Sequence, residues 1–179
     1  MALIKTVPPE KAEGIIKEGY NIFMERIGII PKPMEMMSTS PALFELHLKR
    51  IQYYSTHPKL SFTLLAHIRY LVAHRLDYQF CTDLNEFILK KAGVDNATLK
   101  KMKEDPSASL LEENEKAMLV FVMKAIKDPS SVTADDIQNL KDLGWEDRDM
   151  VDALTQGVSM IDHSIMMQVF KMDQNCLLK

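Results

Sequence analysis

The chain has 179 residues, enough to bury a sizeable core, and fits one domain over 1–179, with 1–8 as a loose arm and 173–179 as a tail. Its 22 basic and 25 acidic residues are interspersed and give a formal net charge of -3, which leaves no basic face for nucleic acid. The longest apolar runs fall far short of the roughly 20 residues of a membrane span, and the N-terminus lacks a signal-peptide core, so we expect a cytoplasmic protein without a membrane partner.

The first third of the chain predicts two helices separated by prolines. Apolar residues recur at helical spacing after Pro9, and Gly28 can end that helix. Prolines 31 and 33 interrupt the pattern, so the following PMEMMS segment is expected to form a short helix or a turn. Ser40 is a good N-cap with Pro41 at the first helical position, which predicts a helix over 41–55.

The next segment begins a helix at Ser61 that runs to about residue 76, where Asp77 leaves two alternatives. Either the helix continues through Asp77, or Asp77 caps a second helix that opens at Tyr78. Only a break places Cys81 in a first helical turn, where the positive end of the helix dipole favours a thiolate. Gly93 ends this region, and Asp95 then begins a short helix to about residue 103.

The last third predicts three more helices. A long helix is expected over about 112–127, and Thr133 with Asp136 forms a capping-box pattern for a helix that ends before Gly144. The final helix starts near Asp147 and carries one apolar stripe. The stripe consists of Val151, Leu154, Val158, Ile161, Ile165 and Val169.

No alternating strand pattern occurs in the sequence, so we predict an all-α protein of about six to eight helices.

A row of polar side chains interrupts the otherwise apolar stretch 61–93, with steps of three or four residues. That spacing places the row on one face of a helix that is apolar on its other sides. Buried polar groups need partners, water or a ligand, so this row is the candidate site. The row comprises Thr63, His67, Tyr70, His74, Tyr78, Cys81 and Asn85.

Further features extend over almost the whole chain, in the segment 27–95 and its continuation over 112–170, and their anchors are Gly28, Pro31, Ser40-Pro41, Leu60-Ser61, Cys81 and Lys91-Ala92-Gly93. On these residues the chain resembles the peroxidase-related, alkylhydroperoxidase D-like branch of the carboxymuconolactone decarboxylase family. The resemblance implies an all-helical, homo-oligomeric protein. It also implies a C-x-x-C-x-x-x-H motif with an upstream glutamate in the peroxidase members. The motif is degenerate here, because its first Cys falls on Tyr78, its second on Cys81, its His on Asn85 and its Glu on Ala66.

A peroxide-reducing cysteine must react as a thiolate and needs an acid for the leaving oxygen. The only other cysteine is Cys176, far away in the sequence, so a Cys81 sulfenic acid would be resolved by an external thiol or by Cys176 if the fold brings it close. His74 is the best remaining base. It precedes Cys81 by about 10 Å on a straight helix, so contact requires the break at Asp77.

We therefore predict an oxidoreductase of the peroxidase-related type, with weak or altered thiol-based hydroperoxide reduction at Cys81. The alternative is a non-catalytic member of the family that has lost the redox site and instead binds a small apolar or aromatic ligand or has a regulatory role. No cofactor and no metal are expected, since the spacing of the two histidines and Cys81 does not allow them to share an ion on a straight helix. The predicted catalytic residues are Cys81, His74 and Tyr78, and the predicted pocket-lining residues are His67, Tyr70, Asn85 and His163.

Two further patterns bear on this choice. The chain has 13 methionines, with clusters at 34–37 and at 166–167, which most often fill cores or interfaces but also suit an adaptable ligand pocket. Arg69 and Arg75 could bind an anion, although each is expected to pair with an acidic neighbour at the surface or at a subunit contact.

Overall fold

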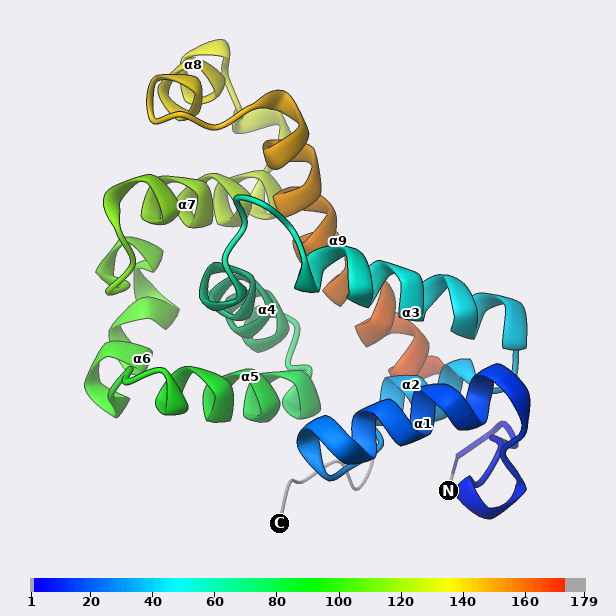
Figure 1. The fold of residues 1–179 in the computed structure, drawn as a ribbon. Helices are drawn as coiled ribbons and strands as arrows, with labels where there is room; N and C mark the ends of the chain where they lie inside the picture. Colours follow the sequence, from blue (N-terminus) through cyan, green and yellow to red (C-terminus); the bar gives the residue numbers. More distant parts are fainter. Residues whose placement is uncertain (1, 173–179) are drawn as a thin grey trace. The chain divides into compact units, whose positions relative to one another are not determined.

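The computed structural model describes residues 2–172, which contain nine α-helices and no β-strand (Figure 1). The all-α prediction is therefore confirmed. The helix count exceeds the expected six to eight because the short segment after Pro31 is helical as well. The described residues form two compact units, residues 2–57 with 165–172 and residues 58–164. That the whole chain acts as one domain stays a prediction.

The first unit is built from three helices and the end of the last one. Gly28 adopts a left-handed conformation with φ of 74° and ends the first helix, as expected. Ser40 precedes a helix at the predicted position, but its hydroxyl makes no capping hydrogen bond. Its backbone ψ is 93°, far from the ψ of 152° at Ser61, whose hydroxyl does cap a helix. The helices are α1 (Gly14–Ile27), α2 (Lys32–Met37) and α3 (Pro41–Ser55), preceded by a 3-10 turn η1 (Pro9–Lys11).

The core of the first unit forms where α1 and α3 pack together. Gly19 makes this approach possible, since a β-carbon there would lie 2.5 Å from the ring of Phe44. The sequence predicts a loose segment before α1. In the structure this segment is held in place, because the hydroxyl of Tyr20 donates to the carbonyl of Val7 at 2.9 Å. The buried core residues are Ala12, Ile16, Tyr20, Met34 and Phe44.

The second unit is organised around α4 (Phe62–Arg75), which packs against α5, α6 and α7. Figure 1 shows α4 between α5 and α7. Most of its side chains are buried, as the apolar sequence predicts, and the hydroxyl of Ser61 accepts from the Leu64 N–H at 3.0 Å to cap it. The other helices are α5 (Gln79–Lys91), α6 (Asn96–Glu104), α7 (Glu113–Lys127), α8 (Ala134–Asp142) and α9 (Asp147–Val169), with 3-10 turns η2 (Pro106–Ala108) and η3 (Pro129–Ser131).

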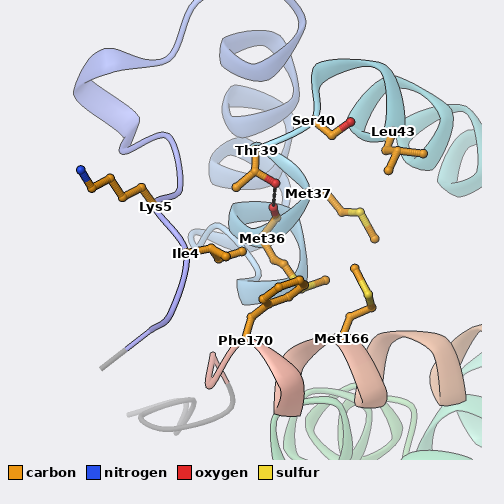
Figure 2. Close-up of a pocket in the computed structure, with 9 residues that line it drawn as sticks. All are labelled: Ile4, Lys5, Met36, Met37, Thr39, Ser40, Leu43, Met166 and Phe170. Carbon is orange, nitrogen blue, oxygen red and sulfur yellow. Dashed lines mark hydrogen bonds between the residues drawn. The ribbon is translucent and has the colours of Figure 1, made fainter.

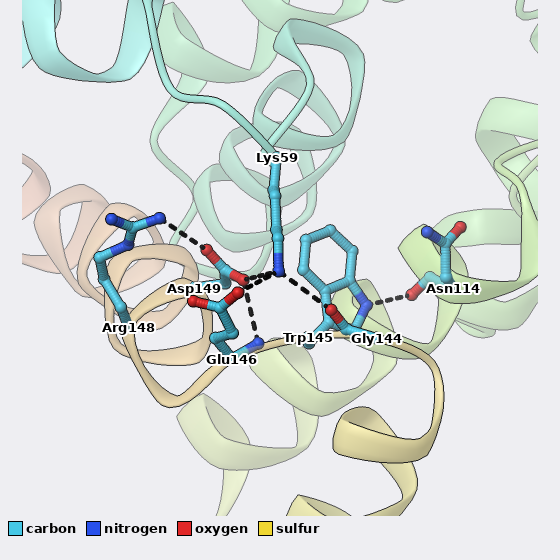
Figure 3. A network of polar contacts seen from close by, with 7 residues as sticks. All are labelled: Lys59, Asn114, Gly144, Trp145, Glu146, Arg148 and Asp149. Carbon is cyan, nitrogen blue, oxygen red and sulfur yellow. Dashed lines mark hydrogen bonds and ion pairs between the residues drawn. The ribbon is translucent and has the colours of Figure 1, made fainter.

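A polar network holds the start of α9 (Figure 3). The fully buried carboxylate of Asp149 accepts from the Glu146 N–H at 3.0 Å and lies 3.3 Å from the ammonium of Lys59. The same ammonium donates to the Glu146 carboxylate at 2.8 Å, and the indole of Trp145 donates to the Asn114 carbonyl at 2.9 Å. The loop between α8 and α9 is therefore tied to residues that flank α4 and α7.

The apolar stripe of α9 is mainly an exposed face, with Val151 exposed to 63% and Ile165 to 57%. The buried side of the helix instead carries small, sulfur-containing and polar side chains, among them Met150, Ala153 and His163. None of the helices in residues 2–172 combines the length and apolar composition that a bilayer span requires.

Candidate functional site

The helix does break near Asp77, as the second alternative predicts, but Asp77 is not the cap, because Tyr78 occupies that position and α5 begins at Gln79. α4 ends at Arg75, and Asp77 adopts a positive φ of 52°, which aspartate tolerates better than most residues. The N–H of Tyr78 turns back to donate to the Ala73 carbonyl at 2.9 Å. Tyr78 occupies the cap position before α5, and Cys81 lies in the first turn of that helix.

Cys81 forms a cluster with Asn85 and Arg69, which we call the Cys81 cluster. The Cys81 residue is only 7% exposed. The amide nitrogen of Asn85 donates to the Cys81 carbonyl at 2.7 Å, and the Nε of Arg69 donates to the Asn85 amide oxygen at 2.8 Å. The asparagine therefore links a guanidinium on α4 to the turn of α5 that carries the thiol.

The charge of Arg69 acts on Cys81. Desolvation by burial lowers the pKa of Arg69 to about 10, and the negative form of the Cys81 sulfur opposes that shift. The guanidinium remains protonated at neutral pH, and because the interaction is mutual it favours a negative charge on the sulfur. The guanidinium carbon also lies 5.6 Å from the centroid of the Phe62 ring.

Arg69 is the site residue that the sequence interpretation missed. Its expected acidic neighbour is not found among residues 2–172, where its contacts are Asn85 and Phe62. The signal that could have identified it is its position within the apolar run LLAHIRYLVA, where a charged side chain needs a polar partner.

A second cluster joins His74 and Tyr70 to α5 and α6. The hydroxyl of Tyr70 donates to Glu86 at 3.4 Å, and the ammonium of Lys103 lies 5.6 Å from the Tyr70 ring centroid. Burial, followed by the charge of Glu86, raises the pKa of Tyr70. Burial and then the charge of Lys103 lower the pKa of His74, against the opposing charges of Asp77 and Glu86. His74 is therefore mainly neutral at pH 7 and able to accept a proton.

His67 is the third polar residue of α4, and it is only 1% exposed. Its Nδ1 lies 2.8 Å from the Thr63 carbonyl and must carry the proton, because a carbonyl only accepts. The other ring nitrogen has no hydrogen-bond partner among residues 2–172. Burial lowers the pKa of His67, opposed first by the hydrogen bond to Thr63 and then by the charge of Glu115 on α7.

The predicted site residues thus lie in several places. Cys81 and Asn85 come together, whereas the Tyr70 hydroxyl donates to Glu86 and the charge of Glu86 acts on His74. Tyr78 is buried at the start of α5, where its carbonyl accepts from the Thr82 hydroxyl at 3.1 Å, and His163 is buried on α9. Cys176 lies outside the described residues. Within residues 2–172, no three His, Cys, Asp or Glu side chains converge as a metal site would require.

The fold has solved counterparts, although no protein-family model and no curated protein matches the chain. One is an alkylhydroperoxidase AhpD core, an uncharacterised peroxidase-related protein from Ralstonia eutropha JMP134. It has 14% sequence identity and a TM-score of 0.80, over 96% of this chain and 90% of that one. A second is an uncharacterised peroxidase-related protein from Silicibacter sp. TM1040, with 14% identity and a TM-score of 0.77, over 95% and 90% of the two chains. The chain therefore has the AhpD-like helical fold.

Proposed function

We propose that this protein is a peroxidase-related oxidoreductase that reduces hydroperoxides with the sulfur of Cys81. The observation that carries the proposal is the Cys81 cluster. The thiol lies in the first turn of α5, near the positive end of the helix dipole, and within the electrostatic reach of the protonated Arg69. Both features favour a thiolate, which is the reactive form of cysteine.

The reaction begins when the thiolate attacks the terminal oxygen of a hydroperoxide. A sulfur–oxygen bond forms, the oxygen–oxygen bond breaks, and the alkoxide that leaves takes up a proton to become an alcohol. The sulfur is thereby oxidised to a sulfenic acid. One thiol of an external dithiol then displaces water from that sulfur, and its second thiol releases the Cys81 thiolate while the reductant becomes a disulfide.

Two residues are candidates for the proton transfers. Tyr78 immediately precedes α5 and stands one helical turn before Cys81, in the position that the family motif gives to its first cysteine. His74 is neutral at pH 7, since its pKa is lowered, and could exchange protons through water. Replacing Tyr78 by Phe and His74 by Asn separates these two roles.

The test is hydroperoxide consumption with dithiothreitol as the reductant. We expect the wild type to consume cumene hydroperoxide above the background rate and Cys81→Ser to fall to background. Cys176→Ser serves as the matched thiol control and should retain activity when the external dithiol resolves the sulfenic acid. Equal rates for the wild type and Cys81→Ser would rule the proposal out.

A second candidate is a non-catalytic role in binding or regulation. It is favoured by the sequence at the motif, where Tyr78, Asn85 and Ala66 replace three of the four catalytic residues that the resemblance implies. The Asn85 amide, in particular, is engaged with Arg69 and with the Cys81 carbonyl and cannot act as an acid or base. Absence of turnover together with an unreactive Cys81 would favour this candidate.

A further inference from the structure

The first unit contains a cavity of about 470 Å³ (Figure 2). All of its lining residues belong to that unit, whereas the Cys81 cluster belongs to the second unit. The volume falls in the range of about 300–1,000 Å³ that is typical of small-molecule sites. The lining residues are Ile4, Lys5, Met36, Met37, Thr39, Ser40, Leu43, Met166 and Phe170.

The cavity wall is mainly apolar and deformable. Figure 2 shows the sulfur-bearing ends of Met37 and Met166 directed toward each other, with the ring of Phe170 beside them. Met36 is buried and closes the same wall. Methionine side chains are unbranched and flexible, so such a wall adapts to the shape of a hydrocarbon body instead of selecting one rigid outline.

The polar groups of the lining favour an anionic end group. The nine lining residues include one cation, Lys5, and no anion. Ser40 stands at the start of α3, a helix of 15 residues, and its hydroxyl is not used as a cap. The Thr39 hydroxyl donates to the Met36 carbonyl at 2.9 Å, so the side-chain donors left for a ligand are the Ser40 hydroxyl and the Lys5 ammonium. In Figure 2 the ammonium of Lys5 points away from the methionines, so this exposed lining residue carries its charge on the side of the cavity opposite the apolar wall.

We propose that this cavity binds an elongated apolar monocarboxylic acid. The hydrocarbon body lies against the methionines and Phe170, and the carboxylate lies at the mouth, near Lys5 and the start of α3. This inference is independent of peroxide chemistry. It gives a role to Met36, Met37 and Met166, which line the cavity, whereas Met34 packs in the core of the first unit.

The experiment uses the full chain labelled with carbon-13 at the methionine methyl groups and titrated with decanoic acid. The acid is kept well below the concentration at which it forms micelles. Saturable shifts are expected in the methyl signals of Met36, Met37 and Met166, whereas those of Met24 on α1 and Met123 on α7 should not move. Uniform shifts at all methionines, or shifts that do not saturate, would overturn the proposal.

Two variants separate the roles of the wall and the mouth. Met37→Trp fills the cavity and should abolish the saturable shifts, whereas Met24→Trp, at an exposed position of α1, should leave them intact. Lys5→Gln should weaken decanoate binding by about two- to fivefold, as expected for one exposed charge pair, and leave decan-1-ol binding unchanged. Lys100→Gln is the matched lysine control. Equal weakening for the acid and the alcohol would contradict the assigned position of the carboxylate.

The other occupant to test is a second copy of the chain. Sedimentation is measured on the same samples with and without decanoate. If the methyl signals of the lining methionines change with protein concentration alone and not with decanoate, the cavity is a protein–protein contact and the ligand proposal is wrong. Because Met37→Trp can fail to fold, the map of shifts in the wild-type protein stands as a separate criterion.

Discussion

At the scale of single residues, the buried His67 should make stability depend on pH. Burial lowers its pKa in the folded protein below the value of about 6.5 expected for the unfolded chain. As the pH falls below about 6.5, the unfolded state therefore binds more protons than the folded state. The contribution of the neutral, buried His67 to the free energy of unfolding is thus fully present above that pH and is lost toward lower pH.

The variant that tests this is His67→Asn, whose amide can still donate to the Thr63 carbonyl that now accepts from the imidazole. Urea unfolding of both proteins is measured between about pH 7.5 and about pH 5. We expect the wild type to lose more stability over this interval than the variant does. Identical pH dependence in the two proteins would show that His67 does not couple to folding.

At the scale of elements, the packing of α9 on α7 depends on Gly157. A β-carbon at this position would lie 2.6 Å from the Ile126 side chain and 2.9 Å from that of Val122. In Gly157→Ala, overpacking should therefore lower the free energy of unfolding by about 1–3 kcal/mol. The higher helix propensity of alanine should offset roughly 1 kcal/mol of this loss. Thr155→Ala, exposed on the same helix, should change stability by less than about 0.5 kcal/mol. Denaturant unfolding measures the loss of stability in each of the two variants. Equally small losses in both would mean that α7 and α9 shift apart easily.

The sequence predicted those elements whose ends are determined locally. The Ser61 cap and the Thr133–Asp136 capping box are both present, because capping needs only residues within one turn of each other. Ser40 shows the limit of that reasoning. Its residue type predicts a cap, but the backbone that arrives from α2 sets a ψ at which the hydroxyl does not reach the helix.

The candidate site was less predictable because it depends on contacts between helices. The row of polar residues was inferred from spacing on one helix, and the break at Asp77 divides that row between α4 and α5. Arg69 was expected to pair with an acidic neighbour at the surface or at a subunit contact, whereas its partner is Asn85, which the pairing of α4 with α5 brings to it. On α9 the apolar stripe suggests a core face, but the packed face uses small and sulfur-containing side chains.

At the scale of the whole molecule, the exposed stripe on α9 bears on the predicted homo-oligomer. Val151 and Val158 are seven residues apart, a spacing at which apolar side chains pair in helix–helix contacts. If the stripe is a subunit contact, placing lysines there buries unpaired charge and weakens assembly. We expect sedimentation to show an oligomer for the wild type and smaller species for the variant that combines Val151→Lys with Val158→Lys. Asn139→Lys, exposed on α8, is the matched control and should sediment as the wild type does.

The resemblance between this chain and solved peroxidase-related proteins extends over nearly the whole molecule at 14% identity. Such a likeness establishes the helical fold, and the same fold can support different chemistry. Activity therefore has to be judged from the Cys81 cluster itself. In this cluster an arginine linked to the site by Asn85 acts on the thiol, so its central property is the charge state of one sulfur.

The most direct test is the pH dependence of Cys81 alkylation by iodoacetamide, measured on the Cys81 peptide in a Cys176→Ser background. We expect the midpoint of alkylation to lie below the ordinary thiol value of about 8.5. In Arg69→Gln we expect it to rise by about one to two pH units, since the neighbouring positive charge is lost, and in Arg69→Lys we expect a smaller rise. A midpoint at or above the ordinary value that does not respond to Arg69→Gln would contradict the account, because the cluster would then hold an inert thiol.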